Sequence, residues 1–118
     1  MTTEIITGSR VGEQYTKIQH PSGLTLLLCP MKGFSGAYAL FAARCGSIDD
    51  NFRTSPDEPY TVVPAGIAHF LEHKLFESEE GDAFEQYAKT GASANAYTSF
   101  DRTAYLFGCT DRFEDSLE

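Results

Sequence analysis

Residues 65–76 read AGIAHFLEHKLF, a largely apolar stretch in which neither proline nor glycine follows Gly66. Pro64 comes directly before it, and proline is favoured in the first turn of a helix. The stretch therefore predicts an α-helix. Because a helix turns by about 100° per residue, its side chains separate into two arcs. One arc carries His69, Glu72, His73 and Phe76, and the opposite arc carries Ile67, Phe70, Leu71 and Leu75.

His69 and His73 are one helical turn apart, so both imidazoles can point toward a single zinc ion. Glu72 precedes the second histidine and is placed to take a proton from a water that the metal holds. This His-x-x-Glu-His order inverts the better-known His-Glu-x-x-His order and is typical of the inverzincins. A single histidine on such a helix is ordinarily a packed or solvated side chain. A helix face with a buried Glu–His pair and no metal is therefore the alternative interpretation.

The composition is that of one small globular domain with a core of its own, since 42% of the 118 residues are hydrophobic. The formal net charge of −8 argues against nucleic acid or an anionic membrane as a partner, and it slightly favours basic or neutral polypeptides. No apolar run reaches the length of a membrane span.

The cellular compartment is predicted from the N-terminus and the cysteines. Residues 1–4 show neither the basic nor the apolar segment of a secretory signal. Cys29, Cys45 and Cys109 are odd in number, lie in or beside apolar segments and have no His or Cys neighbour at ligand spacing. They are therefore predicted to be reduced, mostly buried thiols of a cytoplasmic protein.

Three strands are predicted ahead of the helix, over residues 15–18, 24–29 and 37–43. The second of them is almost wholly apolar, which predicts that it is covered on both faces. His20 stands before a proline and is assigned to the turn that joins the first two strands. Residues 48–63 are polar and predict a surface loop that leads to the helix.

The acidic run after the helix is predicted to be a solvated turn, although carboxylates could also offer oxygen to a metal; it comprises Glu77, Glu79, Glu80 and Asp82. Residues 82–85 have the spacing of a capping box, which predicts a second helix to about residue 89 that ends at Gly91. Residues 93–100 and 103–107 predict an antiparallel hairpin.

The last residues predict a third helix, with Thr110 as its cap and capping-box spacing between Asp111 and Glu114. A helix of little more than one turn is not stable alone. We therefore expect the 118 residues to be the front part of a longer protein, or a product truncated within the fold.

Two motifs in sequence order resemble those of a known family. Residues 66–76 resemble the active-site helix of the insulinase-like metallopeptidases, the M16 or pitrilysin family. Residues 91–98 and 102–105 resemble the strand and hairpin that follow it, and residues 24–30 and 37–47 resemble the early strands. The residues around the two histidines are most similar to those of the bacterial, cytosolic, processing-protease-like members. The resemblance implies an α+β fold, a largely antiparallel sheet with helices packed on one face.

The resemblance also implies roles for individual residues. His69 and His73 would bind zinc, Glu72 would be the general base, and Asn95 and Ala96 would lie on an edge strand that pairs with an extended substrate. The third zinc ligand of the family, a glutamate, would lie beyond residue 118. The chain would then be the N-terminal part of a single peptidase domain that pairs with a second homologous half or subunit.

The expected function is that of a zinc metalloendopeptidase acting on peptides or unfolded polypeptides. With two protein ligands the isolated chain is expected to bind zinc weakly and to show little or no activity. One alternative is a non-catalytic polypeptide-binding or scaffold subunit of the same family. Another is a zinc-binding or peptide-binding module without hydrolytic activity.

Overall fold

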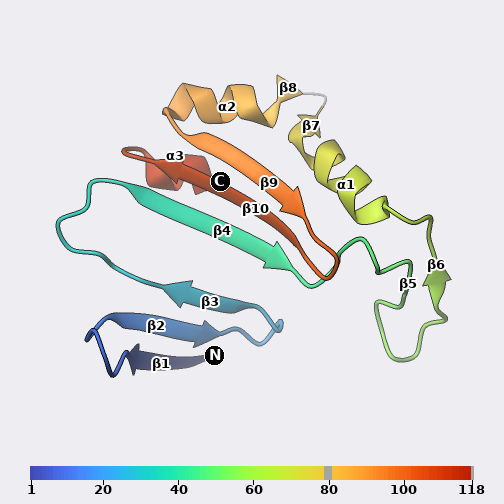
Figure 1. Ribbon diagram of the computed structural model, residues 1–118, viewed down its shortest axis with the longest axis horizontal. Helices are drawn as coiled ribbons and strands as arrows, with labels where there is room; N and C mark the ends of the chain where they lie inside the picture. Colours follow the sequence, from blue (N-terminus) through green and yellow to red (C-terminus); the bar gives the residue numbers. More distant parts are fainter. Residues whose placement is uncertain (79–80, 118) are drawn as a thin grey trace. The chain divides into compact units, whose positions relative to one another are not determined.

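The computed structural model describes residues 1–78 and 81–117 of the chain, which divides into two compact units, Met1–Phe34 and Ser35–Glu118. Figure 1 shows the helices and strands of both. No helix among the described residues is long and apolar enough to cross a membrane.

The first unit is a three-stranded antiparallel sheet in the order β1-β2-β3. Its strands are β1 (Thr2–Thr7), β2 (Gln14–Gln19) and β3 (Thr25–Leu28). The two strands predicted here are confirmed, whereas β1 was not predicted. His20 lies in the predicted turn, where its Nδ1 is 2.7 Å from the hydroxyl of Ser22.

The prediction that the apolar second strand is covered on both faces is wrong. All four residues of β3 are exposed, and Leu27 retains 59% of its accessible surface. The physical reason is that this unit contains one sheet and no helix that could form a second layer over it.

The second unit contains a three-stranded antiparallel sheet in the order β4-β10-β9. Its strands are β4 (Ala37–Ala43), β9 (Ser93–Thr98) and β10 (Thr103–Cys109). The predicted hairpin is confirmed: Thr98 pairs with Thr103, and the N–H of Ser99 donates to the carbonyl of Arg102 at 2.8 Å. Strand β10 therefore lies in the middle of the sheet, and β9 lies at an edge.

Three helices pack on one face of this sheet (Figure 1). They are α1 (Ile67–Phe76), α2 (Ala83–Thr90) and α3 (Phe113–Leu117). Phe107 on β10 contacts an aromatic ring from each of α2 and α3, Tyr87 and Phe113, with ring centroids 5.5 Å apart in both pairs. Phe107 forms the core with Ala92 and Cys109. The predicted α+β fold, with an antiparallel sheet and helices on one face, is confirmed.

The ends of the helices follow local signals in two cases and depart from them in the third. Asp82 caps α2 by accepting from the N–H of Phe84 at 2.9 Å, and Gly91 ends it in the left-handed conformation at φ 76°. The prediction that Thr110 caps the last helix is wrong. Arg112 has φ 54°, a left-handed conformation that a helix cannot contain, so α3 begins only at Phe113.

The polar segment 48–63 is not a plain loop, because it contains a short ladder of β5 (Asn51–Phe52) and β6 (Thr61–Val62). A second short ladder joins β7 (Glu77–Ser78) to β8 (Gly81–Asp82) in the acidic run. Glu79 and Glu80 of that run lie outside the described residues.

The cysteines agree only in part with the prediction of buried thiols. All three are free, and Cys109 is buried in the core of the second unit. Cys45 is half-buried, whereas Cys29 is exposed because it directly follows the uncovered strand β3.

Candidate active site

Helix α1 turns Ala68, Glu72 and Phe76 toward the sheet and leaves most of its apolar arc in solvent. Ala68 and Glu72 are buried, and Phe76 stands one turn further along the same line, with its ring 6.0 Å from that of Tyr105 on β10. Three large apolar side chains on the other arc are exposed, namely Phe70, Leu71 and Leu75. The small side chain of Ala68 lets the first turn of the helix approach the sheet closely. The helix therefore presents Glu72 to β9 and leaves both histidines exposed beside it.

The two histidines converge as predicted. Their Nε2 atoms are 3.1 Å apart, and the rings meet edge to face with centroids 4.7 Å apart. Two nitrogens that each ligate one tetrahedral zinc ion at its usual bond length lie about 3.3 Å apart. The imidazole pair therefore fits a single zinc ion with little movement. His69 lies at the exposed rim of the helix, so the pair can be reached from solvent.

Glu72 lies beside this pair but is directed into the protein. The residue retains only 8% of its accessible surface. Its Oε2 accepts a hydrogen bond from the hydroxyl of Thr98 at 2.6 Å and lies 3.4 Å from Nδ1 of His69. Burial and the nearby Glu72 carboxylate raise the pKa of Tyr105, which lies beneath the helix. A buried carboxylate that contacts a histidine and a hydroxyl is suited to accept a proton and later return it.

Asn95 and Ala96 lie on β9, which pairs with β10 on one side. Among the described parts of the chain no strand pairs with its other side, so β9 is an edge strand, as the predicted role for these two residues requires. The side-chain oxygen of Asn95 accepts from the N–H of Ala96 at 2.9 Å. That backbone donor is therefore occupied by a neighbouring side chain in the absence of a partner strand.

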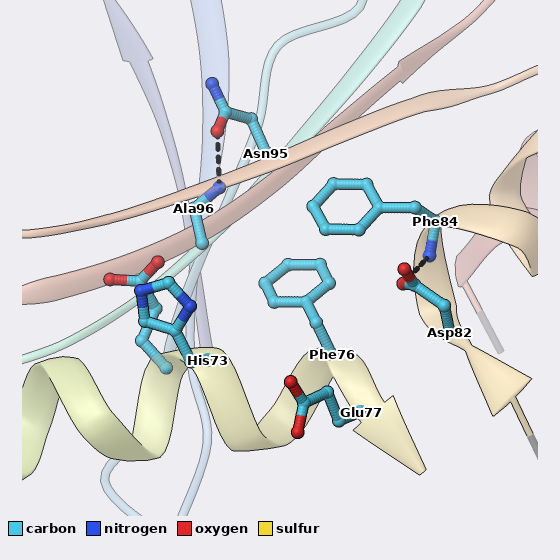
Figure 2. Close-up of a pocket in the computed structure, with 8 residues that line it drawn as sticks. His73, Phe76, Glu77, Asp82, Phe84, Asn95 and Ala96 are labelled. Carbon is cyan, nitrogen blue, oxygen red and sulfur yellow. Dashed lines mark hydrogen bonds between the residues drawn. The ribbon is translucent and has the colours of Figure 1, made fainter.

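A cavity of about 390 Å³ opens between the end of α1, the start of α2 and β9 (Figure 2). His73 and Ala96 line the end nearest the histidine pair. The rings of Phe76 and Phe84 stack further along it, with centroids 4.6 Å apart and planes 12° apart. An open hollow therefore extends from the histidine pair along the edge of the sheet.

The described part of the acidic run forms the short ladder of β7 and β8, which the prediction of a solvated turn did not include, but Glu77 and Asp82 are exposed as predicted. Glu77 is exposed and forms an ion pair with Lys74 at 2.7 Å. This hydrogen bond and the lysine charge lower the pKa of Glu77. Within residues 1–78 and 81–117, no group of three or more His, Cys, Asp or Glu side chains could hold a metal ion. A third zinc ligand is thus not found in the part of the chain that the structure describes.

Sequence reasoning did not identify two residues that contact the site, Thr98 and Tyr105. The structure places both on the strands beneath α1, at positions that alternate with outward-facing residues. Alternation along the strand could have placed Thr98 on the same face as Ala96, because side chains two residues apart point to the same side of a sheet. Alternation does not identify the helix that packs on that face.

Comparison with known proteins gives consistent matches. The family model described as Insulinase (Peptidase family M16) matches residues 60–117. The Bacillus subtilis protein named "Uncharacterized zinc protease YmfH" is 53% identical over 97 residues, which are 82% of this chain and 23% of that protein.

Two solved structures are similar. The M16-like peptidase of Alicyclobacillus acidocaldarius is 39% identical with a TM-score of 0.77, over 99% of this chain and 25% of that one. Pitrilysin is similar in fold, with a TM-score of 0.64 and 23% identity. The match includes 91% of this chain and 11% of the pitrilysin chain. The chain thus spans about a quarter of the length of the first relatives that it matches.

Proposed function

From the premise that this chain belongs to the insulinase family of peptidases, M16, we propose that His69, Glu72 and His73 belong to the active site of a zinc-dependent metalloendopeptidase. The observation that carries the proposal is the convergence of two Nε2 atoms 3.1 Å apart beside a buried carboxylate. The name of the Bacillus relative, a zinc protease, supports the same metal and reaction.

His69 and His73 would hold the zinc ion, and a glutamate outside the 118 residues would be the third protein ligand. Catalytic zinc sites ordinarily have three protein ligands and one position open to water or substrate. Two ligands alone predict weak binding. We therefore propose that the isolated chain has little or no peptidase activity and that catalysis belongs to a protein of the length of its relatives.

When bound, zinc supplies Lewis acidity that lowers the pKa of water and polarises a peptide carbonyl. Glu72 would accept the proton from the attacking water and deliver it to the leaving amine. Its Oε2 is bonded to Thr98 and lies 3.4 Å from Nδ1 of His69, so the carboxylate is held beside the histidine pair. Glu72 would thus act as general base and then as general acid.

The substrate would be a peptide or an unfolded polypeptide that adds to the free edge of β9. An extended chain can form backbone hydrogen bonds with an edge strand, whereas a folded protein presents few such segments. The carbonyl of a substrate would replace the Asn95 side chain at the N–H of Ala96, at the side of the cavity shown in Figure 2.

The chain would pair with a second homologous half or subunit that closes this open site. We also propose a cytoplasmic location, with neither nucleic acid nor membrane as a partner. Three free thiols are compatible with a reducing compartment, and the net charge of −8 opposes contact with polyanions.

The test compares Glu72→Gln with the matched surface variant Glu85→Gln in the full-length protein, with zinc present and an unstructured peptide as substrate. Glu72→Gln should lower kcat by a factor of roughly 10² to 10⁴, because the proton acceptor is lost. Zinc affinity should persist, and Glu85→Gln should retain full activity. Equal, undiminished activity of both variants would exclude Glu72 as the general base. Absence of hydrolysis by the unaltered full-length protein would exclude the enzyme and favour the binding or scaffold subunit.

Metal binding is tested separately by calorimetric titration of the 118-residue chain with zinc. The chain should bind weakly, and His73→Ala should abolish binding because a single imidazole remains. Robust peptide cleavage by the isolated chain with zinc would contradict the proposed need for an additional ligand.

A further inference from the structure

Thr98 is the last residue of β9, and its hydroxyl is the hydrogen-bond donor to the carboxylate of Glu72, 26 residues earlier in the chain. The distance of 2.6 Å is typical of a hydroxyl that bonds an ionised oxygen. The contact joins the proposed catalytic helix to the strand on which the proposed substrate would lie.

The backbone around Thr98 is held firmly. Thr98 pairs with Thr103 across the hairpin, and the following residue, Ser99, bonds to Arg102 at 2.8 Å and accepts from the N–H of Ser47 at 2.9 Å. Threonine is also branched at Cβ, which restricts rotation about χ1. The hydroxyl therefore has a fixed position against which a more flexible side chain can be set.

Glu72 needs such a fixed partner. A glutamate side chain has three rotatable bonds, and a buried carboxylate without a hydrogen bond is costly. The hydroxyl of Thr98 supplies this hydrogen bond to Oε2. The hydrogen bond therefore fixes both the position and the rotation of the carboxylate group.

We propose that Thr98 is a positioning residue that holds the carboxylate of Glu72 in its working orientation. This inference rests on the proposed peptidase function. Thr98 acts through Glu72 and supplies neither a metal ligand nor a contact with the reacting peptide.

The test uses Thr98→Val, which keeps the shape of the side chain but removes the hydroxyl, and Thr98→Ser, which keeps the hydroxyl. In the zinc-loaded full-length protein, Thr98→Val should lower kcat by roughly 10- to 100-fold, the range expected when a catalytic group loses its orienting partner. KM and zinc affinity should stay unchanged. Thr98→Ser should recover most of the lost activity.

Thr103→Val is the matched control, because Thr103 lies directly across the hairpin and its hydroxyl bonds to the backbone carbonyl of Cys45 at 2.8 Å. This variant should lose stability and keep kcat. If Thr98→Val and Thr103→Val reduce kcat equally, or if Thr98→Val and Thr98→Ser do, the contact is structural and the inference is wrong.

A readout independent of activity is the NMR signal of the Thr98 hydroxyl proton in the 118-residue chain. Its exchange with water should be slow, and Glu72→Ala should make it fast while leaving the Thr103 hydroxyl unchanged. Fast exchange in the unaltered chain would contradict the inference. Absence of peptidase activity in the unaltered full-length protein would instead refute the proposed function, since the hydroxyl signal would remain.

Discussion

The two three-stranded antiparallel sheets of this protein differ in what lies over them. The sheet of β1, β2 and β3 contains no buried residue, and the structure describes all of residues 1–34. The sheet of β4, β10 and β9 has three helices over one face, and its strand β10 contributes half of the buried side chains among the described residues. All residues of the candidate site belong to this second sheet and its helices. Strand pairing alone makes a sheet, but a covering layer creates a site.

The largest difference is expected from truncating one large side chain in each sheet. Phe107→Ala should lower the free energy of unfolding by about 3–5 kcal/mol, since Phe107 is 5% exposed and packs between two aromatic rings. Leu27→Ala, at a residue that is 59% exposed, should change it by no more than about 0.5 kcal/mol. Denaturant unfolding of both variants checks this. Equal losses would remove the distinction between a covered and an uncovered sheet.

A smaller loss is expected where the chain leaves β4 and passes under the hairpin. A Cβ on Gly46 would lie 2.4 Å from the carbonyl oxygen of Phe100. Gly46→Ala should therefore cost about 1–3 kcal/mol, as for other overpacked sites. Gly36→Ala is the control, since the nearest atom to a Cβ there lies at 3.9 Å. Thermal unfolding that ranks the two variants in the opposite order would show that this corner is loosely packed.

The covering layer itself depends on the caps of its helices. Asp82→Ala removes the acceptor for the N–H of Phe84 and should cost about 1 kcal/mol, whereas Asp82→Asn retains a capping oxygen and should cost less. Circular dichroism during thermal unfolding measures both. A loss from Asp82→Asn as large as that from Asp82→Ala would mean that charge, and not the hydrogen bond, matters at this position.

The smallest effect is expected at alkaline pH on the covered face. Burial, and secondarily the Glu72 carboxylate, raise the pKa of Tyr105 above its ordinary value of 10.0. The folded state therefore keeps this proton longer than the unfolded state does. The contribution of Tyr105 to the free energy of unfolding is complete below pH 10.0, and it is lost as the pH rises through the pKa that Tyr105 has in the folded state.

NMR titration of the Tyr105 ring checks this direction. Glu72→Gln should lower the pKa of Tyr105 only in part, because burial is the larger cause and remains. Glu85→Gln should leave the titration of Tyr105 unchanged. A Tyr105 that titrates at its ordinary value would place it in solvent, as on an uncovered face.

Much of the fold could be predicted because its signals are local. The helix that contains the motif, the hairpin of residues 93–107 and the cap at Asp82 follow from periodicity and spacing within a few residues. Two features could not be predicted in this way. The exposure of β3 depends on whether another layer of structure packs on its sheet, and the start of α3 at Phe113 depends on the backbone conformation of Arg112.

The sequence by itself determined that His69, Glu72 and His73 share one side of a helix, because the helical repeat places residues three and four apart together. Only the tertiary structure decided that Glu72 turns toward the sheet, while Phe70, Leu71 and Leu75 stay in solvent. The physical reason is that a buried carboxylate requires a hydrogen-bond partner. That partner, Thr98, comes from a distant strand and reaches Glu72 only when the chain has folded.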